Sequence, residues 1–292
     1  MNPIKKAYLA ILITAVVWGS SFVAIRIGLL GCGGGELALL RYLVASLVML
    51  PVYFSIPHRP ALHPKHTPII IFFGVIGIGL YNVTLNIGEV TIPAGAASFI
   101  MSQVPTMTII FAVFAMKERL TVLSWLGICI SIAGVCLISF GQMGIGNINR
   151  GIFFLIAAVF CGGFYSGLQR YITAFYNPLQ LVSLYIWFGT LSLSAYAMPL
   201  WHQLLQASWS TMLAGIYLGI FPGAIGYICW TYALKVIPAS KAASYLFSLP
   251  IIATLLGWAI LDEVPLLMTI IGGSIAVSGA FLVRIKPQRQ NL

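Results

Sequence analysis

Acidic residues are scarce in this chain of 292 residues, which has five aspartates and glutamates against fifteen lysines and arginines. None of the five lies near the middle of an apolar stretch. A carboxylate at membrane depth is costly, and where one occurs it usually serves to bind a proton or a cation. The sequence therefore argues against proton coupling through a mid-membrane carboxylate. Glu36 and Glu89, which we expect at the rims of helices, are the acids left for such a role.

Paired metal ligands and paired cysteines are missing too. The three histidines of residues 58–66 have no cysteine or acid beside them and two prolines interrupt the segment, which favours a solvated loop over a metal site. The five cysteines lie in or beside apolar segments without paired spacing, as is typical of small buried residues: Cys32, Cys129, Cys136, Cys161 and Cys229. Since all four histidines lie in or beside loops, we expect no enzyme, no cofactor and no metal.

Charge of either sign is rare. The chain is 60% hydrophobic and 7% charged, and its mean hydropathy is +1.02. A soluble protein needs a more polar surface than this balance allows. Apolar stretches long enough to cross a bilayer, about 20 residues each, recur from end to end. The sequence therefore predicts an all-α polytopic membrane protein that sits in the lipid bilayer.

Ten transmembrane helices are predicted, separated by breakers such as Gly33-Gly34-Gly35, Asn177-Pro178 and Pro265. The first apolar stretch is too long for the core of a signal peptide, so we interpret it as a retained helix. The predicted spans are 7–28, 36–56, 68–88, 94–115, 121–140, 150–170, 178–198, 209–233, 239–261 and 265–285.

The basic residues that give the net charge of +10 lie in the short loops between these helices. Such a distribution is typical of signals that orient a protein in the membrane, and it argues against nucleic acid as a partner. With the N-terminus in the cytoplasm, twelve of the cations lie inside and only Arg26, Arg41 and Arg150 lie outside. The predicted location is the cell inner membrane, with both termini cytoplasmic.

An internal duplication organises the chain. Residues 92–134 recur as 237–279, a shift of 145 positions with no gap, and Ile92-Pro93-Ala94 recurs as Ile237-Pro238-Ala239. The predicted halves are 1–146 and 147–292, with five helices each. Because five is odd, the second half enters the membrane from the opposite side, so Glu118 and Glu263 are expected on opposite faces. Such inverted repeats typically bind a substrate between the halves.

Several segments resemble EamA-type members of the drug/metabolite transporter superfamily. They are Trp18-Gly19-Ser20-Ser21-Phe22, Arg41-Tyr42, Pro105 with Glu118-Arg119-Leu120, and Pro250 with Glu263. Phe160-Cys161-Gly162-Gly163-Phe164 is a weaker counterpart of the first segment. The resemblance covers essentially the whole chain and implies export or exchange of small metabolites, amino acids among them.

Polar pairs at matching positions are the first candidates for a substrate site. Asn82 and Asn86 share one helix face, and the shift of 145 takes them to Tyr227 and Thr231. We favour a lining of the central cavity, and the alternative is that these side chains only join helices by hydrogen bonds. The complete predicted substrate site is Trp18, Asn82, Asn86, Gln103, Tyr165, Tyr227, Trp230, Thr231 and Tyr245.

Two further sets leave alternatives open. Arg26 and Arg41 either steer an anion or, as we favour, form structural ion pairs with Glu36 or Glu89. Gly127, Ser131 and Gly134 match Gly272, Ala276 and Gly279, so the last helices of the two halves either pack together or join a second protomer in a homodimer.

The sequence as a whole predicts transmembrane export or exchange of a small metabolite, such as an amino acid, by alternating access around a midplane cavity. A flippase for lipid carriers or amphiphiles is the alternative, and a membrane-embedded enzyme is less favoured. The expected partners are a small-molecule substrate and the lipid bilayer.

Overall fold

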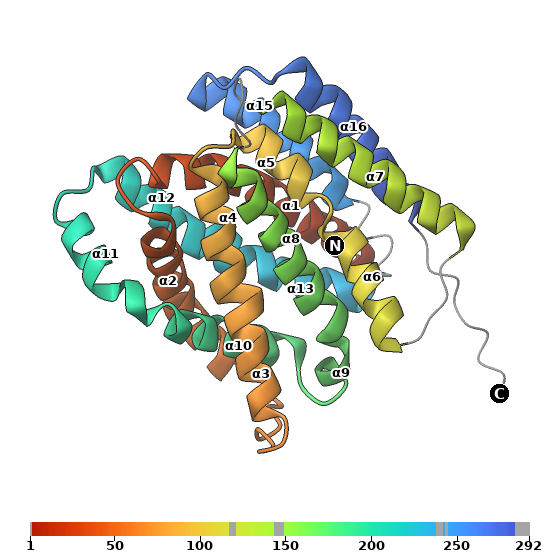
Figure 1. Cartoon of the computed structure of the whole chain (residues 1–292). Helices are drawn as coiled ribbons and strands as arrows, with labels where there is room; N and C mark the ends of the chain where they lie inside the picture. The colour runs from red at the N-terminus through yellow and green to blue at the C-terminus, as the bar shows by residue number, and fades with distance from the viewer. Residues whose placement is uncertain (1, 117–120, 143–148, 238–241, 243–244, 284–292) are drawn as a thin grey trace.

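The computed structural model describes residues 2–116, 121–142, 149–237, 242 and 245–283, and these contain helices and no strand. Figure 1 shows them as one bundle. Glu118 and the expected boundary between residues 146 and 147 lie outside the described residues.

The elements of the first half include a π-helix, η1, within the third span. They are α1 Pro3–Gly28, α2 Gly34–Phe54, α3 Thr67–Gly74, η1 Val75–Leu80, α4 Tyr81–Glu89, α5 Ala94–Met101, α6 Val104–Met116 and α7 Val122–Gly141. Those of the second half are α8 Arg150–Leu168, α9 Arg170–Thr173, α10 Pro178–Ser192, η2 Ser194–Tyr196, α11 Ala197–Leu204, α12 Trp209–Ile220, η3 Phe221–Ile225, α13 Gly226–Val236, η4 Leu246–Ser248, α15 Leu249–Leu261 and α16 Leu267–Leu282.

The described residues form ten apolar spans, in agreement with the sequence prediction. Seven are long and apolar enough to cross a membrane, and an eighth is the pair Pro178–Ser192 and Ser194–Leu204, bent by 48°. The ninth and tenth are the shorter apolar helices Leu246–Leu261 and Leu267–Leu282. The fourth predicted helix differs in detail, because α5 ends at Met101 and α6 starts at Val104.

Side-chain caps explain several helix starts. Asn177 Oδ1 accepts a hydrogen bond from Leu179 N at 3.0 Å, and Pro178 occupies the first turn of α10, where its missing N–H costs nothing. Asn149 Oδ1 accepts from Gly151 N at 2.9 Å at the start of α8. The breakers seen in the sequence thus act as caps.

The two halves each contain a π-helix at the corresponding place. The shift of 145 carries η1, Val75–Leu80, onto residues 220–225, and η3 covers Phe221–Ile225. A π-turn leaves backbone carbonyls outside the regular helical ladder, and such turns occur often at functional sites. Both π-helices lie immediately before residues of the candidate site.

The α7–α16 pair carries the inverted symmetry. A Cβ added at Gly134 would lie 2.5 Å from Gly272 O, and one added at Gly127 would lie 2.7 Å from Gly279 O. Residue numbers along α7 rise from one contact to the next while those along α16 fall, so the two helices run antiparallel. They lie side by side along one edge of the bundle in Figure 1. Gly127 and Gly134 correspond to Gly272 and Gly279, so one contact is the symmetry mate of the other. The small residues therefore join the two halves within one chain. Of the two alternatives, the last helices pack together and do not use these residues to join a second protomer.

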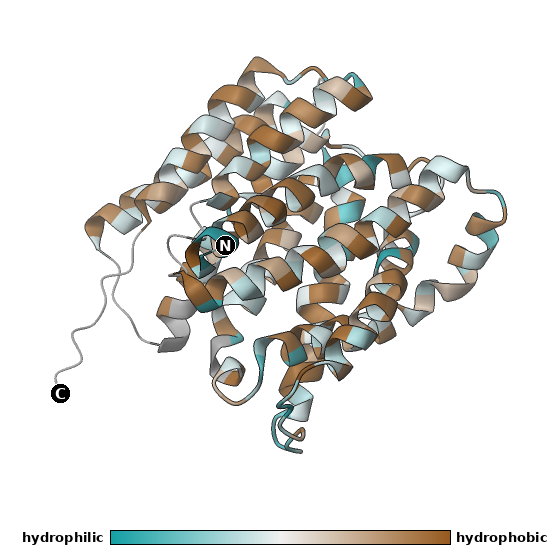
Figure 2. Ribbon diagram, turned by 180° about the vertical axis from the view of Figure 1, so that it is seen from behind, coloured by the Kyte–Doolittle hydropathy of each residue, from teal (hydrophilic) through white to brown (hydrophobic). Residues whose placement is uncertain are grey.

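Apolar side chains cover the outward faces of the helices, and Figure 2 shows hydrophobic residues spread along most of them. Leu12, Phe54 and Leu213 are 58%, 67% and 60% exposed. Trp201 and Trp209, 59% and 78% exposed, flank the connection between α11 and α12, in keeping with anchors at a membrane interface. This surface suits lipid rather than water.

Candidate substrate site

A cavity lies between the two halves. Its wider part holds about 600 Å³ and is lined by residues of α1, α4, α8, α10 and α13, among others. A narrower part of about 170 Å³ adjoins it, and five residues line both: Trp18, Tyr81, Val104, Tyr227 and Leu246. Pockets for small molecules usually measure roughly 300–1,000 Å³. The cavity is therefore large enough for an organic metabolite.

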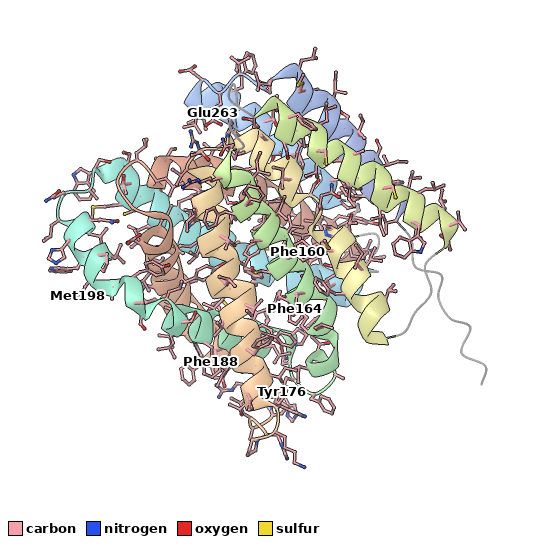
Figure 3. All side chains as sticks on the ribbon, in the orientation of Figure 1. Phe160, Phe164, Tyr176, Phe188, Met198 and Glu263 are labelled. Carbon is pink, nitrogen blue, oxygen red and sulfur yellow. The ribbon has the colours of Figure 1, made fainter. Side chains whose placement is uncertain are left out.

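The two ends of the bundle differ in how they meet this cavity. Figure 3 labels Tyr176 at one end and Glu263 at the other. The wider part reaches the Tyr176 end, where Thr173, Pro178 and Lys235 belong to its lining. The narrower part extends toward the Glu263 end and is lined by Ser21, Phe22, Arg41 and Ser98, among others. The wider part of the cavity thus lies toward the Tyr176 end and the narrower part toward the Glu263 end.

Trp18 is positioned by the second π-helix. Its Nε1 donates a hydrogen bond to Pro222 O at 3.1 Å, which satisfies a carbonyl of η3. The indole lies 5.4 Å from the Tyr227 ring and 5.7 Å from the Trp230 ring, between centroids. Gly226 permits the approach, because an added Cβ there would lie 2.5 Å from Trp18 Nε1. These rings form one aromatic wall between α1 and α13.

A second aromatic wall comes from α8 and α10. The rings of Tyr165 and Tyr185 lie 5.4 Å apart and nearly perpendicular, at 88°. Tyr165 also contacts Gly77 of η1, where any side chain would collide with its ring. Both tyrosines line the wider part of the cavity. Two π-helices, one in each half, therefore lie beside the aromatic walls.

Five of the nine predicted site residues line this cavity: Trp18, Tyr165, Tyr227, Trp230 and Thr231. They come from α1, α8 and α13, and the structure brings them together around one space. Their role toward a substrate remains a prediction.

The two asparagines do not line either part of the cavity. Asn82 is fully buried, accepts from Arg41 Nη1 at 3.0 Å and donates to Tyr42 Oη at 2.9 Å and Ile78 O at 2.8 Å. Asn86 is also fully buried and donates to Gly34 O at 2.9 Å. The expectation that they turn toward Tyr227 and Thr231 is corrected: both face α2, because their helix face packs there.

Gln103 and Tyr245 also lie away from the cavity lining. Gln103 Nε2 donates to Ala276 O of α16 at 3.3 Å, so its side chain joins two helices. Tyr245 is 42% exposed, and its ring lies 6.0 Å from that of Tyr8. Their positions in the sequence pattern did not reveal which side of the helix they occupy.

Other polar residues, which the predicted site omitted, line the cavity. Arg41, Tyr81, Ser98 and Ser102 line the narrower part, and Tyr185 lines the wider part. The arginine-aromatic pair Arg41-Tyr42 and the serines of the fourth span were visible in the sequence. Tyr185 carried no signal that separates it from an ordinary packing residue.

A polar network joins the helices at the Glu263 end. Arg26 Nε contacts Glu263 Oε1 at 2.9 Å, and Arg26 Nη1 donates to Glu89 O at 2.6 Å and Val90 O at 3.0 Å. Glu263 Oε2 accepts from Ala94 N at 2.8 Å. Arg26 thus pairs with Glu263 rather than with the expected Glu36 or Glu89, and the pair joins the first half to the second.

Glu89 is the last residue of α4 and so lies at the rim of its helix, as expected. Its side chain is nevertheless 0% exposed, and neither carboxylate oxygen has a hydrogen-bond partner. Its backbone carbonyl accepts from Arg26 and so belongs to the same network.

The cysteines also differ from expectation. Cys32 is buried, but Cys129 and Cys136 on α7 are exposed, and all five are free thiols. Burial, and secondarily the negative charge of Glu36, raises the pKa of the Cys32 thiol. Because only the thiolate reacts readily, Cys32 should resist thiol reagents at neutral pH.

Cysteine labelling should separate the cavity residues from the packing asparagines. In a cysteine-free background, cysteine at Thr231 or Tyr227 should react with a water-soluble maleimide and should be protected by a transported substrate. Cysteine at Asn82 or Asn86 should not react, because both positions are fully buried against α2. Equal labelling at all four positions would contradict this placement.

Two inverted halves with a cavity between them are typical of transporters. The EamA-like transporter family matches the chain twice, over residues 5–140 and 149–285. The chain belongs to this family. The described spans and these matches identify it as a multi-pass membrane protein.

Individual relatives of this chain also carry the names of transporters. The uncharacterized transporter YdfC of Bacillus subtilis (strain 168) is 32% identical over 277 residues, 94% of this chain and 90% of YdfC. A probable terminal-alkyne amino-acid exporter of Streptantibioticus cattleyicolor is 29% identical and covers 96% of this chain and 94% of its own length. A protein of known crystal structure shares the fold with a TM-score of 0.61 at 18% identity, over 95% of this chain and 96% of that chain. This chain is therefore related to transporters along its whole length.

Proposed function

We propose that this protein exports or exchanges an amino acid, or a metabolite of similar size, by alternating access around the described cavity. The observation that carries the proposal is the cavity itself, which lies between two inverted halves and is lined by Trp18, Tyr81, Tyr165, Tyr227 and Trp230. An aromatic lining suits an apolar side chain or an organic cation. The name of the relative from Streptantibioticus cattleyicolor supports both the amino acid and the outward direction.

The sidedness belongs to the same proposal. The excess of cations on one side supports a cell inner membrane with both termini in the cytoplasm. In this orientation the Tyr176 end faces the cytoplasm, and substrate enters the cavity from there. The network of Arg26 and Glu263 then faces outward and closes the exit. Residues 1–146 and 147–292 are the two halves that rock against each other.

Counterflow in proteoliposomes tests this function. Vesicles preloaded with one amino acid should accumulate the same labelled compound, and the panel is L-leucine, L-phenylalanine and L-propargylglycine, the last of which carries a terminal alkyne. Thr231→Trp should reduce counterflow at least tenfold, because Thr231 lines the cavity and is only 6% exposed. Tyr232→Trp is the matched control, since Tyr232 is 38% exposed on the same helix.

Two outcomes would overturn this proposal. One is the absence of counterflow for every compound, and the other is full activity of Thr231→Trp. Movement of a fluorescent phospholipid instead of the amino acids would support the alternative of an amphiphile flippase.

Exchange should not depend on the carboxylates of Glu36 and Glu89. We expect Glu36→Gln together with Glu89→Gln to leave counterflow within about twofold, because neither side chain lines the cavity and amides replace the carboxylates isosterically. The measurement is initial counterflow at matched amounts of folded protein. A loss of exchange in a folded double variant would show that at least one of these two acids carries coupling.

A further inference from the structure

Arg41 is a buried cation inside a membrane span. It is the eighth residue of α2, so it lies about 10 Å along the helix from its first residue. Its side chain is 6% exposed, and the exposed part contributes to the wall of the narrower cavity. A charge at such a place is costly unless it is paired, and it usually marks a substrate or ion path.

No carboxylate forms an ion pair with Arg41 among the described residues, although the buried Glu89 interacts with it electrostatically from a greater distance. The ion pair formed by the described residues joins Arg26 to Glu263, and Arg41 takes no part in it. Arg41 Nη1 donates to the neutral Asn82 Oδ1 at 3.0 Å, and the guanidinium carbon lies 5.3 Å from the centre of the Tyr42 ring. Its buried Nε has no hydrogen-bond partner. The expected structural ion pair with Glu36 or Glu89 is therefore absent from the described residues, and donor capacity remains unused.

Asn82 fixes the guanidinium. Its Nδ2 donates to Tyr42 Oη and to Ile78 O, which orients the amide so that Oδ1 points to Arg41. Asn82 and Tyr42 are both 0% exposed, so this support is rigid and dry. The arrangement holds one edge of the guanidinium in place.

We propose that Arg41 binds the carboxylate of an α-amino acid substrate, with Asn82 as its positioning residue. This inference rests on the proposed transport function and adds the group that recognises the substrate. A guanidinium presents parallel N–H donors that match a carboxylate and is the preferred partner where such a pair is desolvated. The substrate carboxylate would supply the direct ion-pair partner that Arg41 lacks among the described residues.

The rest of the narrow cavity suits the ammonium group. The hydroxyls of Ser98 and Ser102 donate to Gly95 O and Phe99 O, each at 2.6 Å. Both residues belong to the cavity lining, and each hydroxyl oxygen retains a lone pair for a donor, although Ser102 Oγ also accepts from Gln103 Nε2 at 3.3 Å. An apolar side chain would extend into the wider part, between Trp18 and Tyr227. A substrate without a carboxylate would place an ammonium near an arginine that has no ion-pair partner among the described residues.

Calorimetric titration of the full-length protein in detergent tests this assignment with three matched ligands: L-leucine, L-leucinamide and 3-methylbutylamine. The wild-type protein should bind leucine at least tenfold more tightly than either other compound. Arg41→Gln should weaken leucine binding at least tenfold and abolish the preference. Arg41→Lys should keep the preference for leucine but bind it more weakly, since lysine retains the charge but lacks the parallel N–H donors of the guanidinium. Arg150→Gln, which changes an exposed arginine, should bind like the wild type.

A second measurement needs no variant. Leucine, but not leucinamide, should protect Arg41 from modification by phenylglyoxal, as followed by peptide mass spectrometry. An Arg41→Gln protein that keeps the preference for leucine, or an Arg41 that leucine does not protect, would overturn the assignment and leave the transport proposal intact. Wild-type binding of all three ligands with equal affinity would do the same. Binding of none of the three, together with absent counterflow, would overturn both.

Discussion

Gly134→Leu should prevent the two halves of the chain from assembling. Gly134 faces the α16 backbone, where even an added Cβ would lie 2.5 Å from Gly272 O and would also collide with Ala276 N. The obstacle is the main chain of α16, so relief requires the two helices to separate. Overpacking costs roughly 1–3 kcal/mol where side chains can adjust, and more where backbone must move. We expect a loss of several kcal/mol, seen as aggregation in size-exclusion chromatography or a large fall in melting temperature.

Ala133→Leu is the control for this change, because Ala133 lies on the same helix and is exposed. It adds the same apolar bulk toward lipid and should leave the melting temperature within a few degrees. A Gly134→Leu protein as stable as Ala133→Leu would mean that α7 and α16 are not in backbone contact.

Glu263→Gln should open the Glu263 end. The carboxylate accepts from Arg26 Nε at 2.9 Å and Ala94 N at 2.8 Å, and the two charged side chains are only 29% and 15% exposed. A hydrogen bond to a charged partner contributes roughly 1.5–3 kcal/mol. Because this bond exists while the end is closed, its loss should raise the population of the open state about tenfold.

The readout is the reaction of cysteine at Ser98, in a cysteine-free protein, with an impermeant thiol reagent added at the Glu263 side. Glu263→Gln should accelerate labelling about tenfold, and Arg26→Gln with Glu263→Gln should add little to that. Glu36→Gln is the matched control, since it removes an acid near the same end that forms no ion pair among the described residues. Unchanged labelling in Glu263→Gln would show that the ion pair does not hold this end closed.

Much of the fold could be predicted because it depends on composition and on a repeat that aligns without a gap. Apolar length and the breakers determine the number of spans, and the odd number in each half determines the inversion. The π-helices at Val75–Leu80 and Phe221–Ile225 could not be predicted, since an additional residue in one turn leaves the apolar pattern intact. The break between α5 and α6 was hidden for a similar reason: Ser102 and Gln103 are polar, but they do not end the apolar run.

The site was predictable only in part, for a geometrical reason. Each residue turns a helix by about 100°, and in a chain this apolar the hydropathy does not reveal which face is inside. Tyr227 was found because the repeat makes it the counterpart of Asn82, and Trp18 because it lies in the segment that resembles the EamA family. Asn82 was assigned to the cavity although it lies behind it, and Arg41 was assigned to an ion pair that does not form among the described residues. Neither error could be avoided without knowing how α2 and α4 face each other.

The α7–α16 contact has a consequence for oligomers. Ser131 Oγ donates at 3.0 Å to the carbonyl of Ala276, its own counterpart in the second half, so this pair lies at the pseudo-two-fold axis. The contact is isologous, as in a closed dimer of identical subunits, but both subunits belong to one polypeptide. In a closed interface of this kind, each contact surface is already covered by the other. A second copy of the chain therefore cannot use the glycine-lined surface and must bind through other faces, such as the outer side of α7, where Trp125 and Leu126 are 53% and 54% exposed.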